Sequence, residues 1–110
     1  MKAVKLSGVL PEGDANGINS LARDVLDDPE ALHLVIAVIS TDHITHSVRD
    51  GESQPTMRFM RIESVGEQDS AEALRLMKRA YGRRTGQEML PIALEDDIED
   101  AFKGQSGLTP

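Results

Sequence analysis

Three side chains that can bind a metal ion or move a proton stand close together in the middle of the sequence. They are Asp42, His43 and His46, in the arrangement Asp-His-x-x-His. Carboxylate oxygens and imidazole nitrogens are common zinc ligands. On a helix this spacing would bring the two histidines together, but on a strand they project from opposite faces. The surrounding run, residues 33–48, is rich in Val, Ile and Thr, which favours a strand. We therefore predict no metal site and no cofactor.

Other arrangements typical of catalysis are absent from the sequence. No serine lies in a nucleophile-elbow motif. The glycines near the start, Gly8, Gly13 and Gly17, are too loosely spaced for a phosphate-binding loop and lack its lysine. Because the chain has no cysteine, disulfides and thiolate metal sites are excluded. We predict that the protein is not an enzyme, and we keep a small enzyme as the third of three functional alternatives.

The strand that would hold Asp42 is predicted to be the first arm of a long central hairpin. Residues 33–48 and 56–65 flank a segment with Asp50-Gly51 and Pro55, which are strong turn residues. With a loop from residue 49 to 55, Ile44 would lie near Met60.

The first half of this arm is apolar at both odd and even positions, which is typical of a strand covered on two sides. We therefore expect Ile36 and Val38 to be fully buried.

Helices are predicted on either side of the hairpin. Apolar residues recur with helical spacing from Ile18 to Leu26. Asp69 and Glu72 have the spacing of a capping box, and Gly86 stands where a helix ends. A short acidic helix is expected near Leu94, Ile98 and Phe102, and a short edge strand within residues 1–10.

The predicted fold class is α+β, with a small antiparallel sheet, its long central hairpin, and two main helices packed on it. We expect residues 1–103 to form a single domain and residues 104–110 to be a flexible tail.

One face of the hairpin is predicted to be an interface. Met57 and Phe59 would share it with Thr45 and Ser47, whose side chains are too small to cover them. A second copy of the chain could supply the cover, so we predict a homodimer through these four residues.

Two further segments could contact partners. Arg75, Lys78, Arg79 and Arg83 recur on one face of the second long helix, forming a basic stripe that suits a phosphate backbone. The whole chain has a net charge of −7, which disfavours nucleic acid. Gln87, Leu90 and Ile92 match the Q-x-x-L-x-[FLI] peptides that bind bacterial sliding clamps. Such a peptide binds well because an extended strand stiffened by proline loses little entropy on binding.

The sequence shows neither a secretory signal nor an apolar run long enough to span a bilayer. We therefore expect a cytoplasmic protein that does not bind membranes.

Three short motifs carry a resemblance to a known group of proteins. They are His-Ser-Val-Arg-Asp-Gly at residues 46–51, Pro-Thr-Met-Arg-Phe at 55–59 and Arg-Arg-Thr-Gly at 83–86. With their surroundings, residues 45–65 and 71–101, they resemble small uncharacterised proteins encoded by phages of actinobacteria. The resemblance implies a protein in the host cytoplasm that acts on a larger host or phage machine.

The leading functional prediction is therefore a small non-enzymatic protein that binds other proteins, phage-encoded and acting on a machine of DNA metabolism. The alternative is a nucleic-acid-associated accessory protein that uses the basic stripe within residues 70–85.

Overall fold

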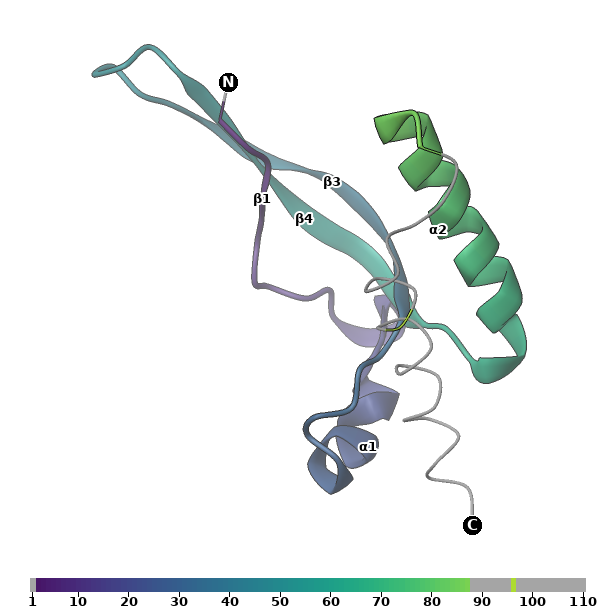
Figure 1. Cartoon of the computed structure of the whole chain (residues 1–110). Coiled ribbons are helices and arrows are strands. Elements are labelled where there is room, and N and C mark those ends of the chain that lie inside the picture. The colour runs from purple at the N-terminus through teal and green to yellow at the C-terminus, as the bar shows by residue number, and fades with distance from the viewer. Residues whose placement is uncertain (1, 88–95, 97–110) are drawn as a thin grey trace. The chain divides into compact units, whose positions relative to one another are not determined.

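The computed structural model describes residues 2–87 and residue 96 (Figure 1). The fold is α+β. In chain order the described elements are β1 (Lys5–Leu6), η1 (Gly13–Ala15), β2 (Asn16–Gly17), η2 (Asn19–Leu21), α1 (Ala22–Asp27), β3 (Val35–His46), β4 (Ser53–Ser64), η3 (Glu67–Asp69) and α2 (Ser70–Thr85), where η marks a 3₁₀ turn. The chain divides into two compact units, one of Met1–Asn19 with Ile36–Glu63, the other of Ser20–Val35 with the chain from Ser64 onward.

The sheet of the first unit is built around β4, which pairs with all three other strands. On one side β1 runs parallel to it, with Leu6 opposite Met57. Further along the same side β2 is also parallel, with Asn16 opposite Ile62. The prediction of a small antiparallel sheet is therefore wrong. The sequence hid these pairings because each N-terminal strand is only two residues long and shows no alternation that could fix its direction.

The turn between β3 and β4 is shorter than the predicted loop. The N–H of Ser47 donates to the carbonyl of Glu52 over 2.8 Å, and the N–H of Gly51 donates to the carbonyl of Ser47 over 2.9 Å. Gly51 has φ +70°, which suits a glycine. The turn reverses the chain, so β3 and β4 run side by side in opposite directions (Figure 1). Pro55 lies inside β4 and not in the loop.

The side chains of His46 and Ser53 face each other across this ladder, with His46 Nδ1 2.7 Å from Ser53 Oγ. Continuing the register places Ser40 opposite Phe59. The expected pairing of Ile44 with Met60 is therefore wrong. The offset is an odd number of residues, so residues expected on one face lie on opposite faces.

The expected burial of the first half of β3 is also wrong. Ile36 and Val38 each have 60% of their surface exposed. Among the described residues only Ile62, on β4, is buried, at 4% exposure. Strand order alone does not explain this difference, since Met60 on the middle strand β4 is also exposed, at 43%. An apolar strand sequence shows that cover is needed but does not show which element supplies it.

In the second unit, α2 ends as the sequence predicts. Gly86 follows it with φ +77°, and its N–H donates to the carbonyl of Gly82 over 2.8 Å, so the predicted role of this glycine is confirmed. The capping box at the other end does not form, because Asp69 makes no side-chain cap. The half-buried apolar side chains of this helix recur with helical spacing: Ala73, Leu74, Met77 and Tyr81.

The first helix, α1, begins at Ala22 and is shorter than the apolar spacing from Ile18 predicts. The residue before β3 and the residue after β4 are hydrogen-bonded, because the N–H of Val65 donates to the carbonyl of Leu34 over 2.9 Å. The predicted acidic helix near Leu94 to Phe102 and the tail 104–110 lie outside the described residues. The single domain over residues 1–103 stays a prediction.

Candidate functional site

The open edge of β3 is the most unusual surface of the first unit. This strand is twelve residues long, and among the described residues it pairs with β4 alone. From residue 35 to 46 it contains no Lys, Arg or Pro, and its one acidic residue is Asp42. Natural proteins block free edges with such charges, with prolines or with bulges, because an unblocked edge offers its backbone to another strand. The edge of β3 has one carboxylate and contains no lysine, arginine or proline.

The backbone hydrogen bonds toward β4 do not follow one alternation along β3. At the turn end the N–H of Ser47 donates to the carbonyl of Glu52, and at the other end the carbonyl of Leu34 accepts from the N–H of Val65. An odd-numbered and an even-numbered residue thus both face β4, so the alternation changes between the two ends. We refer to residues 36–40, in the apolar half of this free edge, as the open edge.

The opposite side of β4 is closed by the N-terminal segment. The N–H of Ser7 donates to the carbonyl of Met57 over 2.8 Å. The Gln54 side chain donates through Nε2 to the carbonyl of Ala3 over 3.0 Å. The Arg61 guanidinium reaches the carbonyl of Asp14 over 3.3 Å. Backbone and side-chain donors therefore secure this edge along most of β4.

Between its two strands the N-terminal segment arches away from the sheet. The segment advances from Leu6 to Asn16 while β4 advances only from Met57 to Ile62, so the extra residues must leave the edge. A cavity of about 330 Å³ lies under this arch, lined by Ser7, Val9, Leu10, Pro11, Glu12, Asp42, Arg58 and Phe59.

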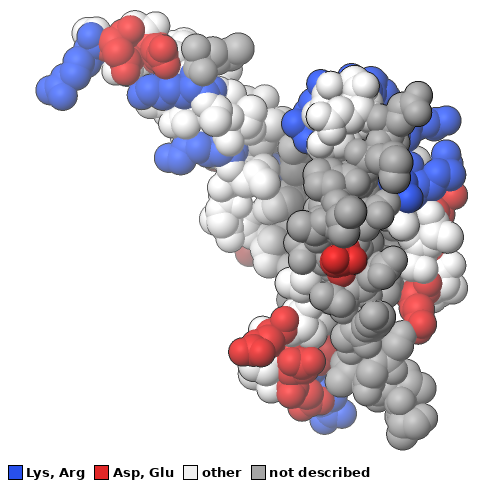
Figure 2. Space-filling view, viewed as in Figure 1, with Lys and Arg blue, Asp and Glu red and all other residues white. Residues whose placement is uncertain are grey.

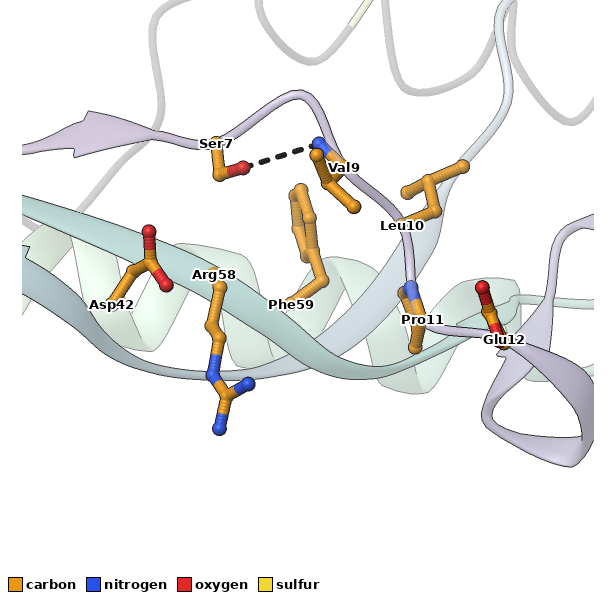
Figure 3. A pocket seen from close by; sticks show the side chains of 8 residues that line it. All are labelled: Ser7, Val9, Leu10, Pro11, Glu12, Asp42, Arg58 and Phe59. Atoms are coloured by element: carbon orange, nitrogen blue, oxygen red, sulfur yellow. Dashed lines mark hydrogen bonds between the residues drawn. The ribbon is translucent and has the colours of Figure 1, made fainter.

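Within this cavity the Phe59 ring points toward the arch and the Arg58 guanidinium points away from it (Figure 3). The cavity therefore offers an apolar ring and the carboxylates of Asp42 and Glu12. None of its lining residues forms a pair of nucleophile and base, so it can hold an apolar group but offers no evident chemistry.

The four residues of the predicted interface are not gathered on one face. Met57 and Phe59 are half-buried, and Phe59 lies beneath the arch. The register turns Thr45 and Ser47 to the opposite face of the sheet. An interface role for these residues stays a prediction.

The Asp-His-x-x-His segment forms two separate contacts. His43 Nδ1 lies 2.9 Å from Asp42 Oδ2, and His46 contacts Ser53. In the described part of the chain, no group of three His, Asp or Glu side chains is arranged to hold a metal ion.

The basic stripe lies along α2, and Figure 2 shows Lys and Arg side chains gathered around one end of this helix. Arg75 is engaged by Glu72 through two side-chain hydrogen bonds. This ion pair lowers the pKa of Glu72 and raises that of Arg75. Arg79 and Arg83 are exposed, and Lys78 is half-buried. The stripe is thus partly neutralised by an acid of its own helix.

The clamp-binding peptide candidate is only partly described. The Gln87 side chain accepts a hydrogen bond from the Tyr81 hydroxyl over 3.0 Å, which ties it back to α2. Leu90 and Ile92 lie outside the described residues.

Comparison with known proteins gives no identification, since no family model, curated protein or solved structure matches the chain. Within residues 2–87 there is no helix both long and apolar enough to cross a membrane. Sequence reasoning missed the open edge because an apolar run suits a covered strand as well as an uncovered one. The absence of Lys, Arg and Pro from residue 35 to 46 was the signal in the sequence for an edge without these blocking residues.

Proposed function

We propose that the protein is a non-enzymatic protein-binding module that takes up an extended strand of a partner along the open edge of β3. The observation that supports this is a twelve-residue edge strand with exposed apolar side chains and only one charged residue of its own. Strand addition to an exposed edge is a common mode of recognition, in which main-chain hydrogen bonds supply affinity and alternate side chains supply specificity.

The apolar side chains of the open edge would select the partner strand. Val38 and Ile36 project on one face of the sheet and Ile39 on the other, and all three are exposed. A partner strand with apolar residues at matching positions gains cross-strand contacts with them. A strand rich in carboxylates is disfavoured by Asp42.

The setting we propose is the cytoplasm of an actinobacterial host during phage infection, on the strength of the resemblance in residues 45–65 and 71–101. The protein would act there on a host or phage machine of DNA metabolism. A sliding clamp is one candidate partner, reached through Gln87, Leu90 and Ile92.

The test compares captured proteins for three tagged full-length chains in an actinobacterial lysate. Val38→Lys places a charge in the open edge. Val48→Lys is the matched control, since Val48 is fully exposed in the turn and outside β3. We expect wild type and Val48→Lys to retain the same proteins and Val38→Lys to lose them. Equal retention by all three would refute binding through the edge.

A second candidate function, binding of nucleic acid, is supported by the exposure of Arg79 and Arg83 on one face of α2. Contacts of this kind weaken steeply with salt. Fluorescence anisotropy with duplex DNA at low and moderate salt tests it. The variant Arg79→Glu/Arg83→Glu should lose any salt-sensitive binding that the wild type shows.

A further inference from the structure

The open edge also indicates which strand it accepts. Resting on the proposed function, in which β3 takes up an extended strand, we infer that this strand is β3 of a second copy. The protein is then a twofold homodimer in which two sheets join edge to edge. This arrangement differs from an interface through Met57 and Phe59, because it uses the strand edge and leaves the arch over Phe59 in place.

The distribution of charge along β3 favours self-pairing. The apolar half, residues 35–39, carries no charge, and the one carboxylate of the strand belongs to Asp42 in the other half. Identical strands that pair about a twofold axis run antiparallel, and each contact occurs twice. With the axis at Val38, the two apolar halves lie against each other and the two Asp42 carboxylates lie on either side of the axis.

The same axis also aligns the backbones of the two strands. Antiparallel strands exchange N–H···O=C bonds between residues that lie opposite each other. With the axis at Val38, Ile36 lies opposite Ser40 of the second copy. Outward donors of one open edge can therefore meet outward acceptors of the other.

The side chains match as well. On one face of the joined sheet Val38 lies beside its own copy. On the other face Ile39 lies opposite Ala37. An axis moved to Asp42 would instead place the two carboxylates directly opposite each other, which destabilises a strand pair.

The area of contact sets the expected strength. Pairing of two strand edges buries less than the roughly 1,200 Å² at which standard interfaces begin, which places it among weak or transient associations. We therefore expect a dimer that dissociates in the micromolar range. Twofold pairing uses the open edge of both copies, so association stops at two chains and does not continue into filaments.

The test is a charge exchange at the residue placed on the axis. Val38→Lys and Val38→Glu are each prepared as full-length chains and studied by sedimentation velocity, alone and mixed. Alone, each variant sets like charges against each other across the axis and should be monomeric at concentrations where the wild type is dimeric. Mixed in equal amounts, the two should form a heterodimer, since Lys then meets Glu. Val48→Lys and Val48→Glu should dimerise like the wild type.

Fold integrity is checked by circular dichroism and thermal melting. Because Val38 is already 60% exposed, both variants should keep the wild-type spectrum. A wild type that stays monomeric at high micromolar concentration, or that forms larger oligomers, would overturn the homodimer. So would variants that dimerise alone, or a mixture that does not associate. If the wild type is monomeric but lysate capture still depends on Val38, the homodimer fails while the proposed function stands. If the wild type is monomeric and lysate capture does not depend on Val38, both the homodimer and the proposed function are refuted.

Discussion

The two edges of the same sheet have opposite characters. Beyond β4 on one side, the N-terminal segment supplies β1 and β2, backbone hydrogen bonds and an arch over Phe59. This segment includes Lys2 and Lys5, the kind of residues that protect an edge. On the other side β3 ends the sheet with apolar residues exposed. One edge is therefore closed by the chain itself. The other lacks the lysines, arginines and prolines that usually protect a free edge.

The largest expected effect is a difference in the free energy of unfolding between substitutions on β4 and on the open edge. Ile62, on β4, is the one described residue that is buried, and Ile36, on β3, is largely exposed. Ile62→Asp should destabilise the fold by about 3–5 kcal/mol, because it buries a charge with no partner. Ile36→Asp should cost no more than about 1 kcal/mol in a dilute, monomeric sample, as surface substitutions do. Urea denaturation of both variants measures the difference.

A large loss of stability in Ile36→Asp at low protein concentration would contradict the exposed position of β3. It would instead support the central-strand position that the apolar pattern of residues 33–48 predicts.

The comparison also shows how far the sequence predicts the fold. The turn glycines Gly51 and Gly86 could be placed because left-handed backbone restricts the choice of residue. The direction of β1 could not, since a two-residue strand has no pattern. The burial of Ile36 was misjudged because an apolar sequence does not reveal whether another element covers the strand, and this error also hid the open edge.

The open edge of β3 could be predicted from the sequence only through the residue types that it lacks. The lack of Lys, Arg and Pro from residue 35 to 46 indicates an unblocked edge. The interface predicted at Met57 and Phe59 relied instead on a register between β3 and β4. That register shifts by an odd number of residues once the turn closes at Ser47 and Glu52.

The second expected effect tests how tightly the closed edge is packed. A Cβ on Gly17, in β2, would lie 2.8 Å from the carbonyl oxygen of Ile62 and would also meet the Glu63 side chain. Gly17→Ala should therefore cost about 1–3 kcal/mol as β2 is pushed from β4. Gly8→Ala is the matched control, since nothing lies within 4 Å of its added Cβ. Thermal melting of both variants should show a lower midpoint for Gly17→Ala alone.

A third, smaller effect concerns the turn that sets the β3–β4 register. Gly51 has φ +70°, and a Cβ there would meet nothing within 4 Å. Gly51→Ala should therefore lose about 1 kcal/mol through backbone strain alone. Gly51→Asn, which tolerates this conformation better, should lose less. Equal stability of the two variants in urea denaturation would mean that the turn does not hold this conformation.

The smallest expected effect concerns Asp50, which lies in the same turn and is close to Lys2 of the N-terminal segment. Asp50 Oδ1 accepts a hydrogen bond from the Glu52 N–H over 2.9 Å, and Asp50 Oδ2 lies 3.5 Å from Lys2 Nζ. The Glu52 N–H first, and then the Ser47 hydroxyl and Lys2, lower the pKa of Asp50 below its ordinary value. A carboxyl whose pKa is lower in the folded state stabilises the fold at pH above its unfolded pKa. That stabilisation is lost as the pH falls through the folded pKa.

The variant Asp50→Asn removes the ionised carboxylate and keeps the shape of the side chain. At neutral pH it should melt slightly below the wild type, and the gap should close as the solution is acidified below the ordinary carboxyl pKa of 3.8. The difference should be small because the group is exposed and its attraction to Lys2 is screened by salt. Lys2→Gln, melted over the same pH series, should reproduce only the salt-sensitive part of the loss in melting temperature. A gap that stays constant down to acidic pH would show that the charge of Asp50 does not contribute, and that its hydrogen bond to the turn acts through shape alone.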